Sequence, residues 1–172
     1  MSVYFCSDLH FGHKNIQKFR QFVLSQNHNE QFICEAWKNK VTKRDDVYVL
    51  GDAAFTMEAI DLFKDLPGRK FLIRGNHDLC DTAAYLKVFA EVYGLFKYKE
   101  FWLSHAPIHP DELRGRLNLH GHVHYQSIPD NRYFNCCVEN LREQFTSPLV
   151  ELDQLRKHIA KHLNNRLRNY HT

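Results

Sequence analysis

Two short runs decide the fold: Asp46-Val47-Tyr48-Val49-Leu50-Gly51-Asp52 and Lys70-Phe71-Leu72-Ile73-Arg74-Gly75-Asn76-His77-Asp78. Each is an apolar stretch that ends at a glycine, which is typical of a strand buried on both faces and followed by a sharp turn. A further strand is expected over residues 2–7. Because helical patterns separate these runs, the sequence predicts an α/β protein.

The helical patterns cover residues 29–41, 57–66 and 81–93, and a final helix is expected over residues 152–167. Aromatic and β-branched residues predict two more strands, over residues 96–103 and 132–138. One face of the final helix carries five basic residues: Arg156, Lys157, Lys161, Arg166 and Arg168. We interpret that face as a solvated helix surface, in preference to a nucleic-acid footprint.

Length and composition indicate a single domain that spans residues 1–172 and has enough apolar residues, 44%, for an ordinary core. A net charge of +3 is too mild to indicate nucleic-acid binding by itself. The apolar runs are too short to span a membrane, and the first residues do not resemble a secretory signal. Five cysteines without disulfide spacing are typical of a reducing compartment. These features predict a cytoplasmic protein, or one of the host cytoplasm if a phage encodes it.

Histidine is unusually frequent, with 12 in 172 residues. Five short motifs hold most of the chemistry, and each follows a predicted strand: Asp8-Leu9-His10, Gly51-Asp52, Gly75-Asn76-His77-Asp78, Ser104-His105-Ala106-Pro107 and Gly121-His122-Val123-His124. Motifs at successive strand ends converge in space in an α/β sheet. Imidazole, carboxylate and amide donors suit Mn²⁺, Fe, Ni²⁺ and Zn²⁺, and the lack of cysteine disfavours a closed structural zinc site.

Spacing within two of these motifs adds a constraint. In Asp8-x-His10 and His122-x-His124 the named residues are two apart. On an extended backbone such residues point the same way, so both side chains of each pair are expected to reach one site.

The ordered set resembles the calcineurin-like metallophosphoesterase family, whose motif series is D-x-H, G-D, G-N-H-[DE], H and G-H-x-H. The resemblance runs from Asp8 to His124, over two thirds of the chain, and misses no ligand position. It implies a four-layer α/β/β/α sandwich, in which mixed sheets are flanked by helices. It also implies a metal-dependent hydrolase that acts on phosphate esters.

Carried onto this sequence, the family pattern implies two divalent metal ions. The first would be held by Asp8, His10 and His124, and the second by Asn76, His105 and His122. Asp52 would bridge both. Mn²⁺ is favoured, with Fe, Ni²⁺, Zn²⁺ and Co²⁺ as alternatives. The implied reaction is attack on phosphorus by a metal-bridging hydroxide, with His77 as general acid at the leaving-group oxygen.

One departure narrows the substrate. Protein serine/threonine phosphatases of this superfamily extend the second motif to G-D-x-x-D-R-G, whereas here Phe55 stands at the later Asp. The chain thus resembles the small bacterial and phage-type members instead. The intervals 79–104 and 108–120 are too short for a cap domain, so the cleft should be open on one side. An open cleft favours phosphodiesters, of cyclic or dinucleotide type.

Alternatives remain on the same residues. A phosphomonoesterase or a nuclease would use the same site, and a non-catalytic binding scaffold would keep the fold with one structural metal. Four loop residues near the motifs are candidates for substrate contact: His13, Asn15, Arg114 and Arg116. Each is read equally well as an exposed polar loop residue. The sequence pattern leaves the natural substrate and the oligomeric state open.

Overall fold

The computed structural model describes the backbone of residues 1–169 and the side chains of residues 1–161. In that part of the chain the strands form two mixed sheets. The first sheet has the order β4-β3-β2-β1-β9, with β1 (Val3–Cys6), β2 (Asp46–Val49), β3 (Arg69–Ile73), β4 (Glu91–Tyr93) and β9 (Val150–Glu151). Strands β1 to β4 run parallel, and β9 pairs antiparallel with β1.

The second sheet has the order β5-β6-β7-β8, with β5 (Leu95–Tyr98), β6 (Phe101–Ser104), β7 (Leu117–His120) and β8 (Tyr133–Asn135). Strands β6, β7 and β8 are parallel, and β5 pairs antiparallel with β6. Two mixed sheets confirm the predicted α/β class.

Aromatic side chains fill the space between the two sheets. Phe5 of β1 lies 6.0 Å from Tyr98 and 6.4 Å from Phe101, measured between ring centroids. Tyr48 of β2 lies 5.1 Å from Tyr98 and 5.9 Å from Phe96. Edge-on and offset rings at these separations are favourable packing geometries. The sheets therefore stack face to face over an aromatic layer.

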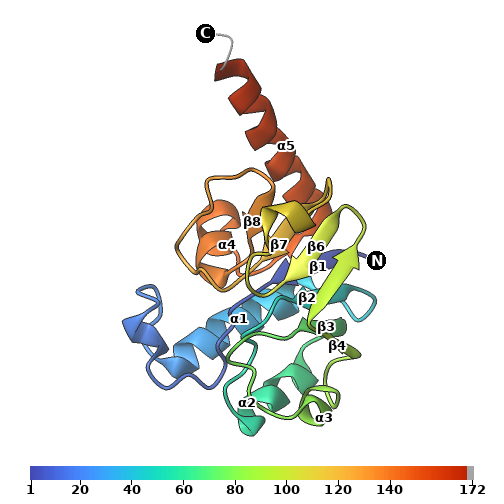
Figure 1. Ribbon diagram of the computed structural model, residues 1–172. Helices are drawn as coiled ribbons and strands as arrows, with labels where there is room; N and C mark the ends of the chain where they lie inside the picture. The colour runs from blue at the N-terminus through green and yellow to red at the C-terminus, as the bar shows by residue number, and fades with distance from the viewer. Residues whose placement is uncertain (170–172) are drawn as a thin grey trace.

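Helices cover the outer faces of both sheets (Figure 1). On the first sheet lie α1 (Gln26–Lys40), α2 (Met57–Asp61), the 3-10 turn η2 (Leu62–Asp65) and α3 (Thr82–Tyr85). On the second lie α4 (Val138–Phe145) and the first turns of α5 (Leu152–Asn169), where Phe134 of β8 contacts Phe145 and His158. The later turns of α5 extend away from both sheets (Figure 1). This gives the four layers that the family resemblance implied. Helix α1 begins three residues earlier than expected because the Ser25 hydroxyl accepts from the N–H of His28.

The predicted helix over residues 81–93 is wrong. Only Thr82–Tyr85 is helical, and Glu91–Tyr93 is strand β4 at the edge of the first sheet. Leu72 and Ile73 pair with Val92 and Tyr93, and the N–H of Arg74 donates to the carbonyl of Tyr93 at 2.7 Å. Pairing with the open edge of β3 outweighs the helical pattern, since β-branched and aromatic residues also suit strands.

Three other boundaries differ from the sequence-based prediction. The single strand expected over residues 96–103 is a hairpin of β5 and β6, where Lys99 adopts a left-handed φ of 50°. The strand expected over residues 132–138 ends at Asn135, and Val138 begins helix α4. The helix expected over residues 57–66 is α-helical only to Asp61 and continues as a 3-10 turn.

The final helix was expected over residues 152–167 and lies within α5. On its basic face, the Arg156 guanidinium donates to Glu100 at 2.6 and 3.0 Å, so this charge is engaged in an ion pair. The side chains of Arg166 and Arg168 lie outside the described residues.

Candidate metal centre

The loops that follow β1 and β2 run side by side and set the position of the site. The N–H groups of Asp8 and His10 donate to the carbonyls of Gly51 and Asp52, each at 3.0 Å. Five of the eight non-glycine residues with positive φ in the described chain are Asp8, His10, Asp52, His122 and His124. Such backbone is strained, and it persists only where surrounding contacts determine it.

This finding corrects the expectation of extended backbone in the two His-containing pairs. Asp8 and His10 have φ of 58° and 53°, and His122 and His124 have φ of 72° and 50°. Asp8 and His10 do reach one group. His122 and His124, however, turn toward different groups of side chains, because the chain bends between them in place of continuing strand β7.

Asp8 presents one oxygen to the protein and the other to the site. Its Oδ2 accepts from the Ser7 hydroxyl at 2.7 Å, the His122 N–H at 2.9 Å and the Cys137 thiol at 3.1 Å. Its buried Oδ1 has no hydrogen-bond donor within the described chain. Burial opposes ionisation of Asp8, but His10, His105 and Ser7 outweigh it and hold the pKa of this carboxyl below its usual range. Asp8 is thus a fixed carboxylate with a free oxygen.

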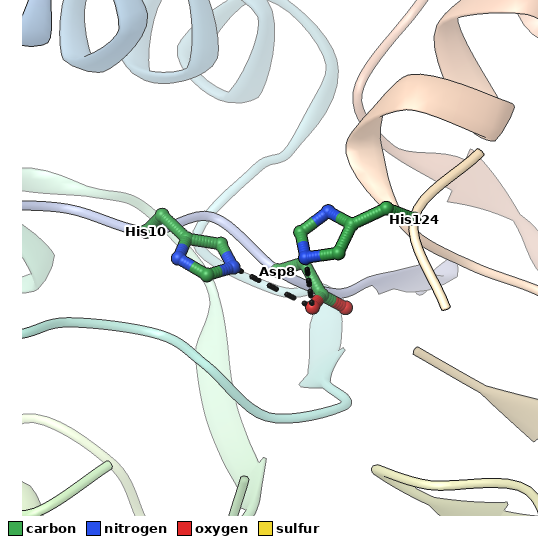
Figure 2. Close-up of side chains that lie close together, drawn as sticks. All are labelled: Asp8, His10 and His124. Carbon is green, nitrogen blue, oxygen red and sulfur yellow. Dashed lines mark ion pairs between the residues drawn. The ribbon is translucent and has the colours of Figure 1, made fainter. Parts of the chain in front are cut away.

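His10 and His124 both face that free oxygen (Figure 2). The Nε2 atoms of His10 and His124 lie 3.5 Å and 3.6 Å from Asp8 Oδ1. Both ring nitrogens of His10 are buried without a hydrogen-bond partner in the described chain, and burial lowers the pKa of this ring. In a neutral imidazole one nitrogen carries a hydrogen and the other a lone pair, and a buried lone pair without a partner is costly unless a group such as a cation takes it. These three residues therefore fit a metal ion.

A buried carboxylate orients the ring of His124. Its Nδ1 lies 3.2 Å from Oε1 of Glu139, and this hydrogen bond raises the pKa of His124. The same oxygen accepts from Nε of the fully buried Arg20 at 2.9 Å. A proton held on Nδ1 leaves the Nε2 lone pair for a ligand, as in the carboxylate–histidine pairs that support many metal sites.

A second group lies on the other side of Asp52. Nε2 of His105 is 3.4 Å from Asp52 Oδ1 and 2.8 Å from Asn76 Oδ1. Nδ1 of His122 is 3.0 Å from Asn76 Oδ1. Since Nδ1 of His105 bonds the Leu50 carbonyl at 2.8 Å, it must be the donor there, and Nε2 carries a lone pair. The lone pairs of His105 Nε2 and Asn76 Oδ1 then lie 2.8 Å apart and repel each other, and a cation bound by both atoms would relieve this repulsion.

Asp52 stands between the two groups. Its Oδ2 is 3.7 Å from His10 Nε2, whereas its Oδ1 faces His105 and accepts from the His77 N–H at 2.8 Å. It is 2% exposed. The carboxylate thus offers one oxygen to each side, which is the arrangement needed to offset the repulsion of two cations.

Asp78 fixes the loops that carry these ligands. Its carboxylate accepts from the N–H groups of Asp52 and Gly75 at 2.9 and 2.8 Å, and from Ala53 at 2.8 Å. The loops after β2 and β3 are therefore held together through one buried side chain.

Three motif glycines are required by close approach. A Cβ at Gly75 would overlap the Asp52 carboxylate, and one at Gly121 would overlap Ser7 and Asp8. A Cβ at Gly51 would overlap the His105 ring, and its φ of 91° also favours glycine. The glycines let the backbone pass directly against the ligand side chains.

His77 lies at the mouth of the site and is exposed. Its ring stacks on Phe55, with centroids 5.1 Å apart and planes at 21°, and lies 5.9 Å from the His10 ring. A pocket of about 400 Å³ opens beside it. The lining residues are His10, His13, Ile16, Phe19, Phe55, His77, His124 and Tyr125.

Of the four residues predicted to contact substrate, two lie at or beside the pocket and two do not. His13 lines the pocket. Asn15 is exposed at the start of the 3-10 turn η1 (Ile16–Lys18), and its N–H donates to His13 Nδ1 at 3.2 Å. The structure does not bring Arg114 or Arg116 to the site. Arg114 pairs with Glu112 at 3.2 Å after the 3-10 turn η3 (Pro110–Glu112), and Arg116 donates to the Lys99 carbonyl at the amino end of β6.

Sequence patterns missed the residues that support the ligands. Ser7, Arg20, Cys137 and Glu139 contact Asp8 or His124, yet none belongs to a ligand motif. Arg20 and Glu139 are 119 positions apart in the chain, so no spacing could relate them. Asp78 stands within a motif, but its contacts to backbone N–H groups are visible only in the folded chain.

The geometry defines a class of protein. Two sets of three acidic and histidine residues have ligand atoms within 4.8 Å of one another, and each set could hold a metal ion. The first set is Asp8, His10 and His124, and the second is Asp8, Asp52 and His105. Ligands of this kind at the carboxyl ends of strands, in two stacked mixed sheets, indicate an α/β protein with a metal-binding site.

The sequence profile described as calcineurin-like phosphoesterase matches residues 1–168, and the chain belongs to that family. It is a metal-dependent phosphoesterase, a hydrolase that acts on phosphate esters. The resemblance inferred from the motifs is confirmed.

Relatives span phages, archaea and bacteria. The Gene 66 protein of Mycobacterium phage L5 is 31% identical, over 74% of this chain and 79% of that protein. The uncharacterized protein MJ1445 of Methanocaldococcus jannaschii is 32% identical, over 92% of each chain. The crystal structure of the Aquifex aeolicus protein AQ665, of unknown function, is similar with a TM-score of 0.72 at 26% identity, over 91% of this chain and 98% of that one.

In the described part of the chain, no helix is both long and apolar enough to cross a bilayer.

Proposed function

We propose that this phosphoesterase hydrolyses phosphodiesters, of cyclic or dinucleotide type, at a pair of divalent metal ions. The observation that carries the proposal is the position of Asp52, whose two oxygens face the two groups of ligands. Asp8, His10 and His124 would hold one ion, and Asn76, His105 and His122 the other. Asp52 would contact both.

The chemistry of the donors supports Mn²⁺ as the metal, with Fe, Ni²⁺, Zn²⁺ and Co²⁺ as alternatives. When bound, such ions supply a nucleophile from water at neutral pH and stabilise charge on the phosphoryl oxygens. The protein's part is to hold the phosphate between the two groups. The backbone contacts of Asp8, Asp52 and Asp78 fix the ligand loops before substrate arrives.

His77 is our candidate for the general acid. Its backbone N–H donates a hydrogen bond to Asp52 Oδ1, which fixes the loop, while its ring is exposed beside the pocket. Imidazole can donate a proton near neutral pH, so the ring can protonate the oxygen of a departing alcohol. The stacked Phe55 ring limits the directions that His77 can take.

Preference for diesters rests on the open side of the site. Asn76, His77 and His122 are exposed, and only short segments lie in the two intervals where a cap domain would be inserted. Groups on both sides of a phosphate can therefore extend into solvent or into the pocket.

The compartment we propose is the cytoplasm, or the host cytoplasm if a phage encodes the protein. The five cysteines of the chain are free thiols, which supports a reducing compartment.

The test compares bis(p-nitrophenyl) phosphate with p-nitrophenyl phosphate, each assayed with Mn²⁺, Fe²⁺, Ni²⁺, Co²⁺, Zn²⁺ and Mg²⁺. We expect metal-dependent hydrolysis, with a higher kcat/KM for the diester. Faster hydrolysis of the monoester would favour a phosphomonoesterase. Cleavage of oligonucleotides that weakens steeply with salt would favour a nuclease.

A further inference from the structure

The pocket beside the metal centre has an aromatic wall, which we call the aromatic pocket. It shares His10, His77 and His124 with the site. The remaining lining residues are His13, Ile16, Phe19, Phe55 and Tyr125. Its volume of about 400 Å³ falls within the range of small-molecule sites. A group held here would therefore lie next to a phosphate at the metal centre.

Three rings of this wall pack against one another. His13 meets Phe55 edge-on at 4.8 Å and Phe19 edge-on at 5.6 Å, between centroids. Two of the lining rings are largely exposed: Phe19 is 64% exposed and Tyr125 is 59% exposed. Large apolar surfaces that stay exposed next to a catalytic site are typical of ligand contacts.

The character of the lining restricts the ligand. The eight described lining residues contain no Asp, Glu, Lys or Arg, so the aromatic pocket suits an uncharged group. Its rings suit a flat one, because planar groups gain from stacking. His13 adds a polar contact. Its Nδ1 accepts from the Asn15 N–H, so the proton of the neutral ring is on Nε2 and can be donated to a heterocycle.

We propose that the aromatic pocket binds the base of a nucleotide whose phosphate lies at the metal centre. The inference rests on the proposed phosphoesterase function and specifies its substrate class. A heterocyclic base is flat, uncharged at neutral pH and rich in hydrogen-bond acceptors. Phe19 and Tyr125 would stack on it from the open side, and Phe55 would line the inner side next to His77.

The experiment measures the dissociation constants of adenosine 5′-monophosphate and ribose 5-phosphate for the Mn²⁺-loaded full chain, by calorimetry. The two probes share the ribose and its 5-phosphate and differ at C1, which carries adenine in one and a hydroxyl in the other. The ratio of their dissociation constants therefore reports the contribution of the base. Stacking on aromatic side chains predicts that the adenosine compound binds roughly tenfold tighter or more. In Phe19→Leu and Tyr125→Leu, which keep apolar bulk but remove a ring, the ratio should fall toward one.

Leu24→Ala is the matched control. Leu24 is 81% exposed and does not line the pocket, so this variant should keep the wild-type ratio. Equal binding of the two probes by the wild type, or a ratio unchanged in both ring variants, would overturn the proposal.

Hydrolysis of bis(p-nitrophenyl) phosphate by the same samples separates this inference from the proposed function. Hydrolysis together with equal binding of the two probes would support the proposed phosphodiesterase function and contradict the base-binding site. Selective binding of the adenosine compound without hydrolysis of any ester would support the base site and contradict the function.

Discussion

Oε1 of Glu139 lies 3.2 Å from Nδ1 of His124, on the side of the ring away from Asp8. Burial opposes ionisation of Glu139, but His124 and Arg20 outweigh it and hold its pKa below the usual range. The charged carboxylate keeps the ring of His124 in the tautomer and orientation that a metal ligand needs. Glu139 is therefore a positioning residue, and it lies outside every ligand motif.

Glu139→Gln should weaken binding of Mn²⁺ roughly 10–100-fold, because loss of a carboxylate partner lowers the basicity of a ligating histidine and loosens its orientation. Calorimetric titration of the metal-free protein measures this. The control is Glu143→Gln, an exposed position on the same helix. Equal Mn²⁺ affinity in the two variants would show that Glu139 does not act on the site.

Substitution by alanine, which adds one methyl group, should impair Mn²⁺ binding at the motif glycines but not at a glycine outside the motifs. Gly75→Ala and Gly121→Ala would push a Cβ into Asp52 or into Ser7 and Asp8, and should cost about 1–3 kcal/mol of stability together with most of the Mn²⁺ affinity. At Gly94 a Cβ would meet no described atom within 4 Å. Gly94→Ala should therefore bind Mn²⁺ as the wild type does, and similar losses in all three variants would refute the close-approach argument.

His77→Asn should bind Mn²⁺ like the wild type but lose turnover on a diester with a poor leaving group, such as a dinucleotide. General acids contribute roughly 10²–10⁴-fold, and p-nitrophenolate, which departs without a proton, should show a smaller loss. Comparison of kcat on the two esters tests the assignment. A loss of the same size on both would mean that His77 does not protonate the leaving group.

Asp45, which lies outside the metal centre, should make the stability of the fold depend on pH. Its carboxylate accepts from the N–H of Ser2 and from the N–H and hydroxyl of Thr42, and these bonds hold its pKa below the usual value. A depressed folded pKa stabilises the protein above the unfolded pKa of about 3.9, and the contribution is lost as pH falls through the folded value.

Asp45→Asn should therefore cost about 1–3 kcal/mol at pH 7, and the difference from wild type should shrink as the pH falls below about 4. Urea unfolding at a series of pH values provides the measurement. Asp111→Asn is the control, because that side chain is 88% exposed. A constant difference between Asp45→Asn and wild type at every pH would contradict the role of the charge.

The strands that carry the ligands could be predicted, because β1, β2 and β3 are short apolar runs that end where a motif begins. Strand β4 could not, since residues 91–93 become a strand only when the edge of β3 is there to pair with them. The ligand motifs could also be recognised, because they follow a known order. The left-handed backbone at Asp8, His10 and Asp52 could not be predicted, because it depends on contacts between loops that are distant in the chain.

Support for the ligands was equally invisible in the sequence. Arg20 donates to Glu139, to Asn29 and to the carbonyl of Asp8, and each partner comes from a different part of the chain. Arg114 and Arg116 show the opposite case. They are close to motifs in sequence, but Arg116 bonds to Lys99 at the amino end of the strands, while ligands gather at the carboxyl ends.

The most direct test of a two-metal phosphoesterase is a Mn²⁺ titration of the metal-free protein, with bound metal and hydrolysis of bis(p-nitrophenyl) phosphate measured in the same samples. We predict two ions per chain, hydrolysis that appears as they bind, and loss of both in Asp52→Asn. One tightly held ion per chain with no hydrolysis would contradict the account and indicate a binding scaffold.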